Sequence, residues 1–165
     1  MFFEKKLLWS NTNEGLFHSE EKLINRQTGS DLIAAYDENG LFTLDSTHIQ
    51  ILKSSRFNLK FILAIFNSKL LNFYYHNLIR EEGRVFAQVK TIILKTLPIK
   101  DIIIKQQQPF ISIVDRILAI TKDGTYLQNS QKQAKVKTLE AEIDQLVYKL
   151  YGLTEEEIKV VESPS

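Results

Sequence analysis

The segment spanning residues 22–52, KLINRQTGSDLIAAYDENGLFTLDSTHIQIL, constrains the fold of this chain more than any other. Apolar residues in it alternate with polar ones, which is typical of strands that bury one face. The dipeptide Asn39-Gly40 lies between two apolar runs and favours a hairpin turn, because both residues accept positive φ. We therefore expect three strands: 22–28, then 32–36, then a bent strand over 41–44 and 48–52. The second and third should form a hairpin closed at Asn39-Gly40.

Downstream, apolar residues recur every three or four positions, which predicts one long apolar helix over residues 59–78 with Asn58 as its N-cap. A strand at Thr91–Leu94 should follow and end at Leu97-Pro98, because proline cannot continue a ladder of backbone hydrogen bonds.

The C-terminal third predicts helices. Pro109 suits the first turn of a helix over 110–122. A second helix, 131–151, ends at Gly152, and Thr154 with Glu157 forms a capping box that opens a last helix over 155–161. The second helix carries a coiled-coil-like apolar seam, which comprises Val136, Leu139, Ile143, Leu146 and Leu150.

Together these elements predict an α+β fold. A small mixed or antiparallel sheet would pack on one long apolar helix, followed by a C-terminal helical hairpin. The stretch Gln106–Pro109 is the best boundary, so we expect an α/β binding module over 1–105 and a helical scaffold or docking region over 106–165. Residues 1–105 hold 14 Lys and Arg against 11 Asp and Glu, whereas residues 106–165 hold 7 against 9. A basic first part and an acidic second part fit a nucleic-acid surface on a helical support, although an ordinary solvated surface explains the asymmetry as well.

The sequence offers no catalytic centre. It has no cysteine and no glycine-rich phosphate loop, and the histidines His18, His48 and His76 lie in different predicted elements, so no metal site is expected. Each histidine is expected to be structural or exposed. Asp45, Ser46 and His48 lie too close together on one strand to aim at one reacting atom. Neither a signal peptide nor a membrane-spanning run is found, which predicts a cytoplasmic protein without membrane contact.

What remains is a set of basic and polar side chains that can bind DNA, since Arg and Lys bind phosphates and Gln can read adenine. The candidates are Lys22, Arg26, Gln27, Thr28, Arg56, Arg84, Gln88 and Lys90. Two alternatives stay open at this point. The seam of helix 131–151 can act as a protein-interaction scaffold through helix-mediated self-association, or the chain can be a small enzyme of unrecognised type.

The order of several short stretches resembles one family. LINRQTG (23–29), IAAYD (33–37) and GLFTLDS (40–46) resemble the TaqI-like C-terminal specificity domain of adenine-specific DNA methyltransferases and of fused restriction-modification enzymes. The resemblance continues through LAIFNSKL (63–70), FYY (73–75), FAQVK (86–90), LPI (97–99) and VYKLYGLTEEEI (147–158).

This resemblance implies a target recognition domain for double-stranded DNA. Arg26, Arg56, Arg84 and Lys90 would hold phosphates, while Gln27, Thr28 and loop residues near Asn39 or Gln88 would meet base edges. The partner would be a methyltransferase catalytic domain, in cis or as a separate subunit, that binds S-adenosylmethionine and flips an adenine. The Asn-Pro-Pro-Tyr motif of such enzymes is absent here, so the chain itself should bind no cofactor and should neither methylate nor cleave DNA.

Overall fold

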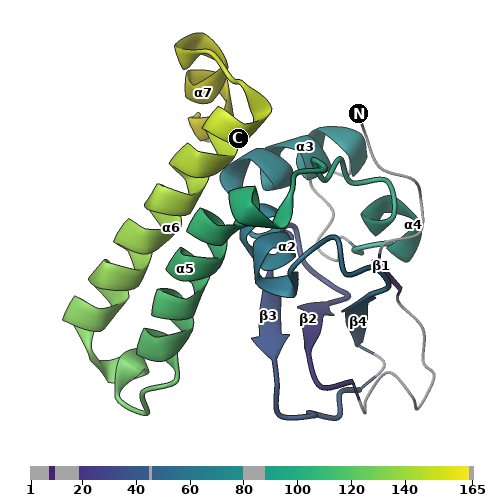
Figure 1. The fold of residues 1–165 in the computed structure, drawn as a ribbon, viewed down its shortest axis with the longest axis vertical. Coiled ribbons are helices and arrows are strands. Elements are labelled where there is room, and N and C mark those ends of the chain that lie inside the picture. Colours follow the sequence, from purple (N-terminus) through teal and green to yellow (C-terminus); the bar gives the residue numbers. More distant parts are fainter. Residues whose placement is uncertain (1–7, 10–18, 45, 80–87, 164–165) are drawn as a thin grey trace.

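The computed structural model describes residues 8–9, 19–44, 46–79 and 88–163. Four strands form one sheet in the order β1-β4-β2-β3: β1 (Leu8–Trp9), β2 (Lys22–Arg26), β3 (Ala34–Asp37) and β4 (Thr47–Leu52). The helices are α2 (Leu59–Phe66), α3 (Lys69–Ile79), α4 (Thr91–Leu94), α5 (Ile104–Thr121), α6 (Ser130–Tyr151) and α7 (Glu155–Glu162), with a 3₁₀ turn, η1 (Tyr126–Gln128), between α5 and α6. Figure 1 shows the sheet on one side of the molecule and the paired helices α5 and α6 on the other.

The central strand of the sheet is β2, which pairs antiparallel with β3 on one side and with β4 on the other. Strands β3 and β4 therefore run in the same direction with β2 between them, and the predicted hairpin between them is wrong. Residues 41–44, expected as a strand, lie in the connection from β3 to β4. Since Thr47 faces Arg26 and Asp37 faces Lys22, this connection begins at one end of β2 and returns to the sheet at the other.

The turn at Asn39-Gly40 nevertheless forms. Gly40 adopts a φ of 70°, the left-handed region that glycine tolerates. The Asp37 carboxylate accepts hydrogen bonds of 2.9 Å from the backbone N–H groups of Asn39 and Leu41. The dipeptide therefore fixes the local bend correctly, but a local bend does not decide which strand pairs with which.

The predicted long helix is two helices. Asn58 caps α2 as expected, with its side chain accepting from Lys60 N–H at 2.8 Å. The helix stops at Phe66, and α3 begins at Lys69. At the junction the Ser68 hydroxyl donates to the carbonyl of Ile65 and accepts from Leu71 N–H, so side-chain bonds replace the helical pattern there.

The predicted strand at Thr91–Leu94 is also wrong, because these residues form the single helical turn α4. Ile92 is 72% exposed whereas Leu94 is buried, so the turn presents one apolar side chain to the core and another to solvent. β-branched residues favour strands only where a neighbouring strand is available to pair with them.

Helix α5 begins before the predicted boundary. Pro109 is its sixth residue rather than a first-turn residue, and Gln106–Pro109 lies inside the helix. Gln107, expected in a linker, is fully buried. Its side-chain oxygen accepts from Asn58 N–H at 2.9 Å, and its nitrogen donates to the carbonyls of Arg56 and Ile102. The division into 1–105 and 106–165 stays a prediction, but this glutamine joins the two parts.

The C-terminal helices follow the prediction. Gly152 ends α6 with a φ of 75°, and Thr154 with Glu157 forms the capping box of α7. The seam of α6 packs inside the chain: Val136, Leu139 and Ile143 are buried. Helices α5 and α6 run side by side and form the predicted C-terminal helical hairpin (Figure 1).

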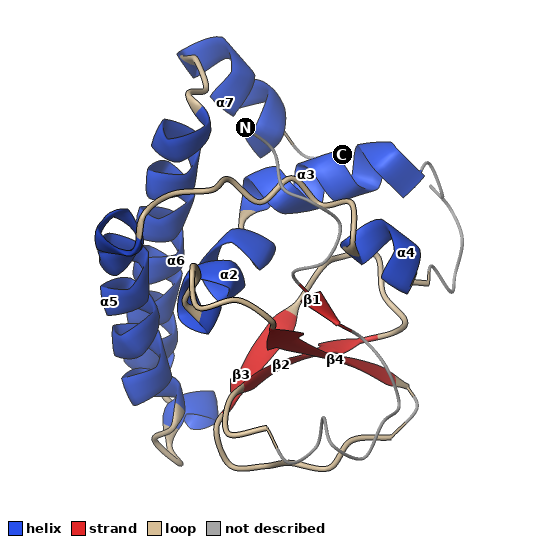
Figure 2. Ribbon diagram, turned by 45° about the vertical axis from the view of Figure 1, so that its right-hand side comes forward, coloured by secondary structure: helices blue, strands red, loops and turns tan. Residues whose placement is uncertain are grey.

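One core joins the sheet to the helices. Leu23 of β2, Phe61 of α2, Phe110 of α5 and Leu139 of α6 belong to the same buried cluster. The rings of Phe61 and Phe110 meet edge to face with centroids 5.2 Å apart. Figure 2 shows α2 on one face of the sheet and no described helix on the other. The α+β fold class is confirmed, and among the described helices none has both the length and the apolar character needed to cross a bilayer.

Candidate nucleic-acid interface

The polar end of β2 is joined to a segment some sixty residues away in the sequence. Gln27 N–H donates to the carbonyl of Ser46 at 2.8 Å, and the Gln27 carbonyl accepts from Val89 N–H at 2.8 Å. Thr28 and Gln88 form an antiparallel bridge. Five of the eight predicted DNA-binding residues therefore lie together. We refer to them as the β2-end cluster, which comprises Arg26, Gln27, Thr28, Gln88 and Lys90.

Buried polar side chains of the sheet form hydrogen bonds that fix the backbone of this cluster. The ring nitrogen Nε2 of the buried His48 lies 2.7 Å from the carbonyl of Val89, so an N–H there donates to it and fixes the 88–90 segment against β4. On the same face of the sheet, the buried Gln50 donates to the Asn25 side-chain oxygen at 2.6 Å. Asn25 in turn donates to the carbonyl of Arg26 at 3.1 Å. The backbone beneath the cluster is therefore anchored to the sheet rather than to a loose loop.

The side chains of the cluster are accessible. Arg26, Thr28, Gln88 and Lys90 are exposed and Gln27 is half-buried. The guanidinium of Arg26 lies over Gly29, where a Cβ would come within 2.7 Å of the arginine Nε. Two cationic side chains flank three that both donate and accept hydrogen bonds, a combination suited to phosphates and to the polar edges of bases.

Lys22, also predicted to bind DNA, has a different role. Its side chain is fully buried, and Nζ lies 3.0 Å from the Asp37 carboxylate across the β2–β3 pair. Burial raises the pKa of Asp37, but hydrogen bonds from Asn39 N–H, Lys22 and Leu41 N–H outweigh it, and the net pKa is lowered. The assignment of Lys22 to the interface does not fit this position, because an accessible cation is needed to reach a phosphate.

Two further predicted residues lie outside the cluster. Arg56 is exposed and forms an ion pair with Asp101. It follows the last residue of β4 by four positions, at the end of that strand farthest from Arg26. Arg84 lies outside the described residues. The loop near Asn39, expected to meet bases, follows Asp37 and therefore lies at the Lys22 end of the sheet.

The histidines are structural where they are described. His48 supports Val89, as above, and His76 has Nε2 at 3.0 Å from both the Ser30 carbonyl and the Asp31 carboxylate. His18 and Asp45 lie outside the described residues. Within the described residues, no group of three or more His, Cys, Asp or Glu side chains is arranged to hold a metal ion. Sequence reasoning missed the supporting roles of Asn25, His48 and Gln50. A period of two places polar residues on the open face of a sheet, whereas these three side chains are buried and bond within the chain.

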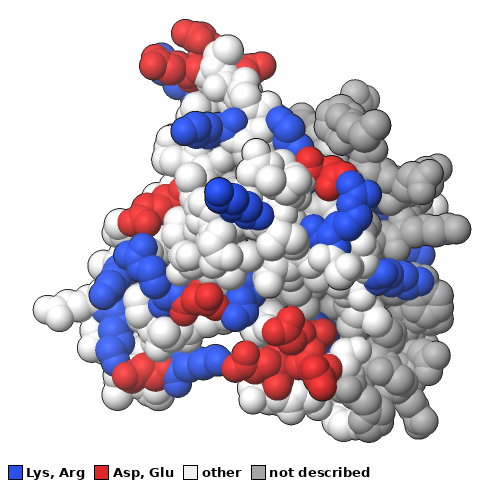
Figure 3. Space-filling view, in the orientation of Figure 1, with Lys and Arg blue, Asp and Glu red and all other residues white. Residues whose placement is uncertain are grey.

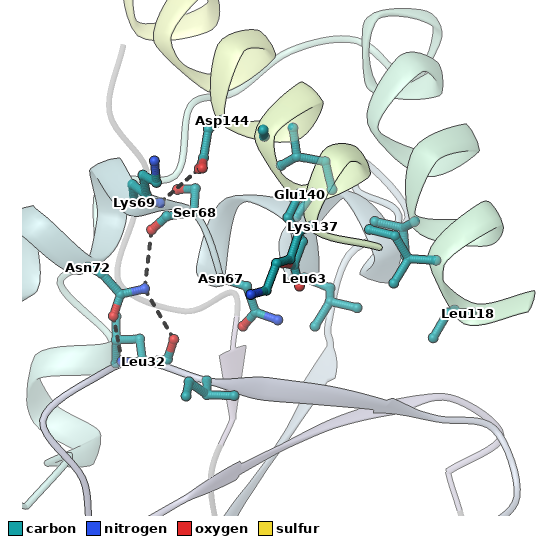
Figure 4. Close-up of a pocket in the computed structure, with 16 residues that line it drawn as sticks. Leu32, Leu63, Asn67, Ser68, Lys69, Asn72, Leu118, Lys137, Glu140 and Asp144 are labelled. Carbon is teal, nitrogen blue, oxygen red and sulfur yellow. Dashed lines mark hydrogen bonds between the residues drawn. The ribbon is translucent and has the colours of Figure 1, made fainter. Parts of the chain in front are cut away.

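A groove between the sheet edge and the helices is a second candidate site (Figure 4). Its volume is about 510 Å³. Apolar side chains, including Leu63, Val114 and Ile143, line most of it, and polar side chains line one end. The polar groups at that end already bond this chain: Asn67 and Asn72 bond the backbone of 32–34, and Asp144 accepts from Lys69 N–H at 2.9 Å. The polar groups of Asn67, Asn72 and Asp144 are therefore committed within the chain, while Lys137 and Glu140 also line the groove.

The helical face is not a cationic surface. Figure 3 shows Lys and Arg over α5 and α6 mixed with Asp and Glu, with a separate acidic group near the sheet. Several of these charges are paired: Arg116 of α5 with Glu142 of α6, and Asp115 of α5 with Lys60 of α2. Such mixed pairs are typical of solvated surface and offer little to a polyanion.

Comparison with known proteins identifies a family for the sheet-bearing part of the chain. The family model of the TaqI-like C-terminal specificity domain matches residues 1–99, which contain the whole sheet, α2 to α4 and every residue of the cluster. No curated protein matches the chain. The family is one of specificity domains of DNA methyltransferases, which supports a DNA-recognition role and suggests no catalytic activity in this domain. The chain belongs to the TaqI-like C-terminal specificity domain family.

Proposed function

We propose that this chain is the target recognition part of a restriction-modification DNA methyltransferase and reads duplex DNA with the β2-end cluster. The observation that supports the proposal most directly is the backbone pairing of 27–28 with 88–89. It brings cationic and amide side chains to one accessible end of the sheet. Arg26 and Lys90 bind phosphates and set the register on the duplex. Gln27, Thr28 and Gln88 then meet base edges in the major groove.

The chemistry belongs to another part of the enzyme. An adenine methyltransferase domain, in cis or as a separate subunit, flips its target base and binds S-adenosylmethionine. This chain carries no glycine-rich cofactor motif and no Asn-Pro-Pro-Tyr sequence. Its role is to place that domain, with or without an attached nuclease, at the correct site.

The interaction-scaffold alternative finds less support. It needs the α6 seam to be available to a second chain, yet Val136, Leu139 and Ile143 are each buried within this one. Exposed positions on α5 and α6 remain free to dock the catalytic domain without opening the core.

Salt-dependent binding of the full chain to a pool of random-sequence duplexes tests the proposal. Each phosphate contact contributes about 0.9 to the slope of log affinity against log salt. The double variant Arg26→Ala/Lys90→Ala should therefore reduce that slope by about two and weaken binding to all sequences. Arg56→Ala is the matched control: this arginine is exposed but lies at the opposite end of the sheet, so the slope should not change. If the folded chain binds no duplex at low salt, the proposal is wrong.

A further inference from the structure

The connection from β3 to β4 carries three large apolar side chains that are each more than half exposed. Leu41 is 57% exposed, Phe42 is 71% exposed and Leu44 is 80% exposed. Leu44 is the most exposed of the large apolar side chains in the described part of the chain. Exposing several such side chains on one short connection is unfavourable in water and marks surface that a partner covers.

Leu44 lies beside the β2-end cluster, and its backbone is held in place. Its carbonyl accepts two hydrogen bonds from Thr47, one from the backbone N–H at 3.2 Å and one from the hydroxyl at 2.9 Å. Thr47 faces Arg26 across the β2–β4 pair, and the Ser46 carbonyl accepts from Gln27 N–H. The chain therefore returns to the sheet at the cluster with its last apolar side chain exposed and its backbone fixed.

The chemistry of DNA restricts what an apolar side chain can recognise there. In the major groove, the bases present hydrogen-bond donors and acceptors and one apolar group, the 5-methyl group of thymine. Glutamine and arginine read the polar atoms, but only an apolar neighbour distinguishes thymine from uracil, which presents the same polar atoms without the methyl group.

We propose that Leu44 is a specificity-determining residue that contacts a thymine 5-methyl group in the recognised DNA sequence. This inference rests on the proposed function, because it assigns Leu44 to the same DNA surface as Arg26 and Gln27. Burying one methyl group against leucine contributes enough for an affinity preference of about threefold to fivefold.

Replacement of thymine by deoxyuridine tests the contact. The preferred duplex is first selected from a random pool with the full chain, and each thymine in it is then replaced in turn. The wild-type chain should bind at least one of these duplexes about threefold to fivefold more weakly than the parent. Leu44→Ala should bind parent and replaced duplex equally at that position and keep the salt slope of the wild type, whereas Leu44→Ile should keep the preference.

Leu127→Ala is the matched control, because Leu127 is 77% exposed and lies in η1, between α5 and α6. It should leave the thymine preference intact. The inference is wrong if the wild-type chain tolerates deoxyuridine at every position, or if Leu44→Ala retains the full preference. It is equally wrong if Leu44→Ala changes only self-association, because the connection is then a protein contact. In each of these cases the proposed function still holds if the chain shows salt-dependent DNA binding that requires Arg26. If the chain binds no DNA at all, the proposed function is wrong as well.

Discussion

The side-chain amide of Asn67 bonds both backbone polar groups of Ala34. Its oxygen accepts from Ala34 N–H at 2.8 Å, and its nitrogen donates to the Ala34 carbonyl at 2.9 Å. Asn72 does the same for Leu32, with bonds of 2.6 and 3.2 Å. Since β3 is an edge strand, these two amides occupy the place of a neighbouring strand and close an edge that would otherwise pair with another chain.

Asn67→Ala should therefore lower the free energy of unfolding by about 1–3 kcal/mol, because it leaves the N–H and the carbonyl of Ala34 without their partner. Urea denaturation followed by circular dichroism measures this loss. Asn77→Ala is the matched control: Asn77 donates only to the Phe73 carbonyl on the exposed side of α3, and its removal should cost less than about 0.5 kcal/mol. Equal losses of unfolding free energy in the two variants would mean that the Asn67–Ala34 hydrogen bonds stabilise the fold no more than an exposed one does.

Local signals in the sequence predicted the ends of elements well. The Asn58 cap, the Gly152 C-cap and the Thr154–Glu157 capping box each depend on residues within four positions of one another, and all three are confirmed. The long-range choices could not be read in the same way. Asn39-Gly40 bends the chain as expected, but β3 pairs with β2, and only the folded chain brings Asp37 to Lys22.

In the candidate site, too, the residues that are close in sequence could be predicted as a group, whereas the long-range contacts could not. Arg26, Gln27 and Thr28 could be predicted as a group because they are consecutive in the sequence. Their proximity to Gln88 depends on a bridge across sixty residues, which no local pattern encodes. Lys22 is a polar residue at the start of an apolar strand, and a lysine there looks exposed unless its buried carboxylate partner is known.

Lys22 and Arg26 should differ in what their loss affects. Lys22→Ala leaves Asp37 buried without its cation and should destabilise the fold by about 3–5 kcal/mol. Arg26→Ala should change the unfolding free energy by less than about 0.5 kcal/mol, because its side chain is exposed, while weakening DNA binding. Urea denaturation and duplex titration of both variants separate the two roles. A Lys22→Ala chain as stable as the wild type would contradict the structural assignment.

The Asp37 carboxylate should make stability depend on acidity. The hydrogen bonds from Asn39 N–H, Lys22 and Leu41 N–H outweigh burial and hold its folded pKa below the ordinary value of 3.8. Its contribution is therefore complete above that value and is lost as pH falls through the lower, folded pKa. The urea midpoint should fall with pH in this acidic window, and Asp37→Asn should show a smaller fall from a lower starting stability. If both proteins lose stability in parallel, other carboxylates control the acid transition.

Ile143 provides a test of whether the α6 seam acts within the chain. It is 6% exposed and belongs to the core cluster, so Ile143→Ala should cost about 2–5 kcal/mol of unfolding free energy. The mass measured by sedimentation should not depend on this substitution. Ala141→Ser, on the exposed side of α6, is the control and should change neither quantity. A wild-type dimer that Ile143→Ala dissociates without unfolding would favour the scaffold alternative instead.

Gly29 should affect DNA binding through Arg26 rather than directly. A Cβ at position 29 would lie 2.7 Å from the Arg26 Nε, and the backbone φ of 156° disfavours any side chain there. Gly29→Ala should therefore push the guanidinium away from its position and cost about 1 kcal/mol of stability through backbone strain. Duplex affinity should fall, although by less than in Arg26→Ala, because a displaced cation still attracts phosphates.

Two comparisons test this prediction: the control Gly124→Ala, whose Cβ would meet nothing within 4 Å, and the double variant Gly29→Ala/Arg26→Ala. If Gly29 acts through Arg26, the double variant binds no more weakly than Arg26→Ala alone, whereas additive losses would show that Gly29 contributes separately.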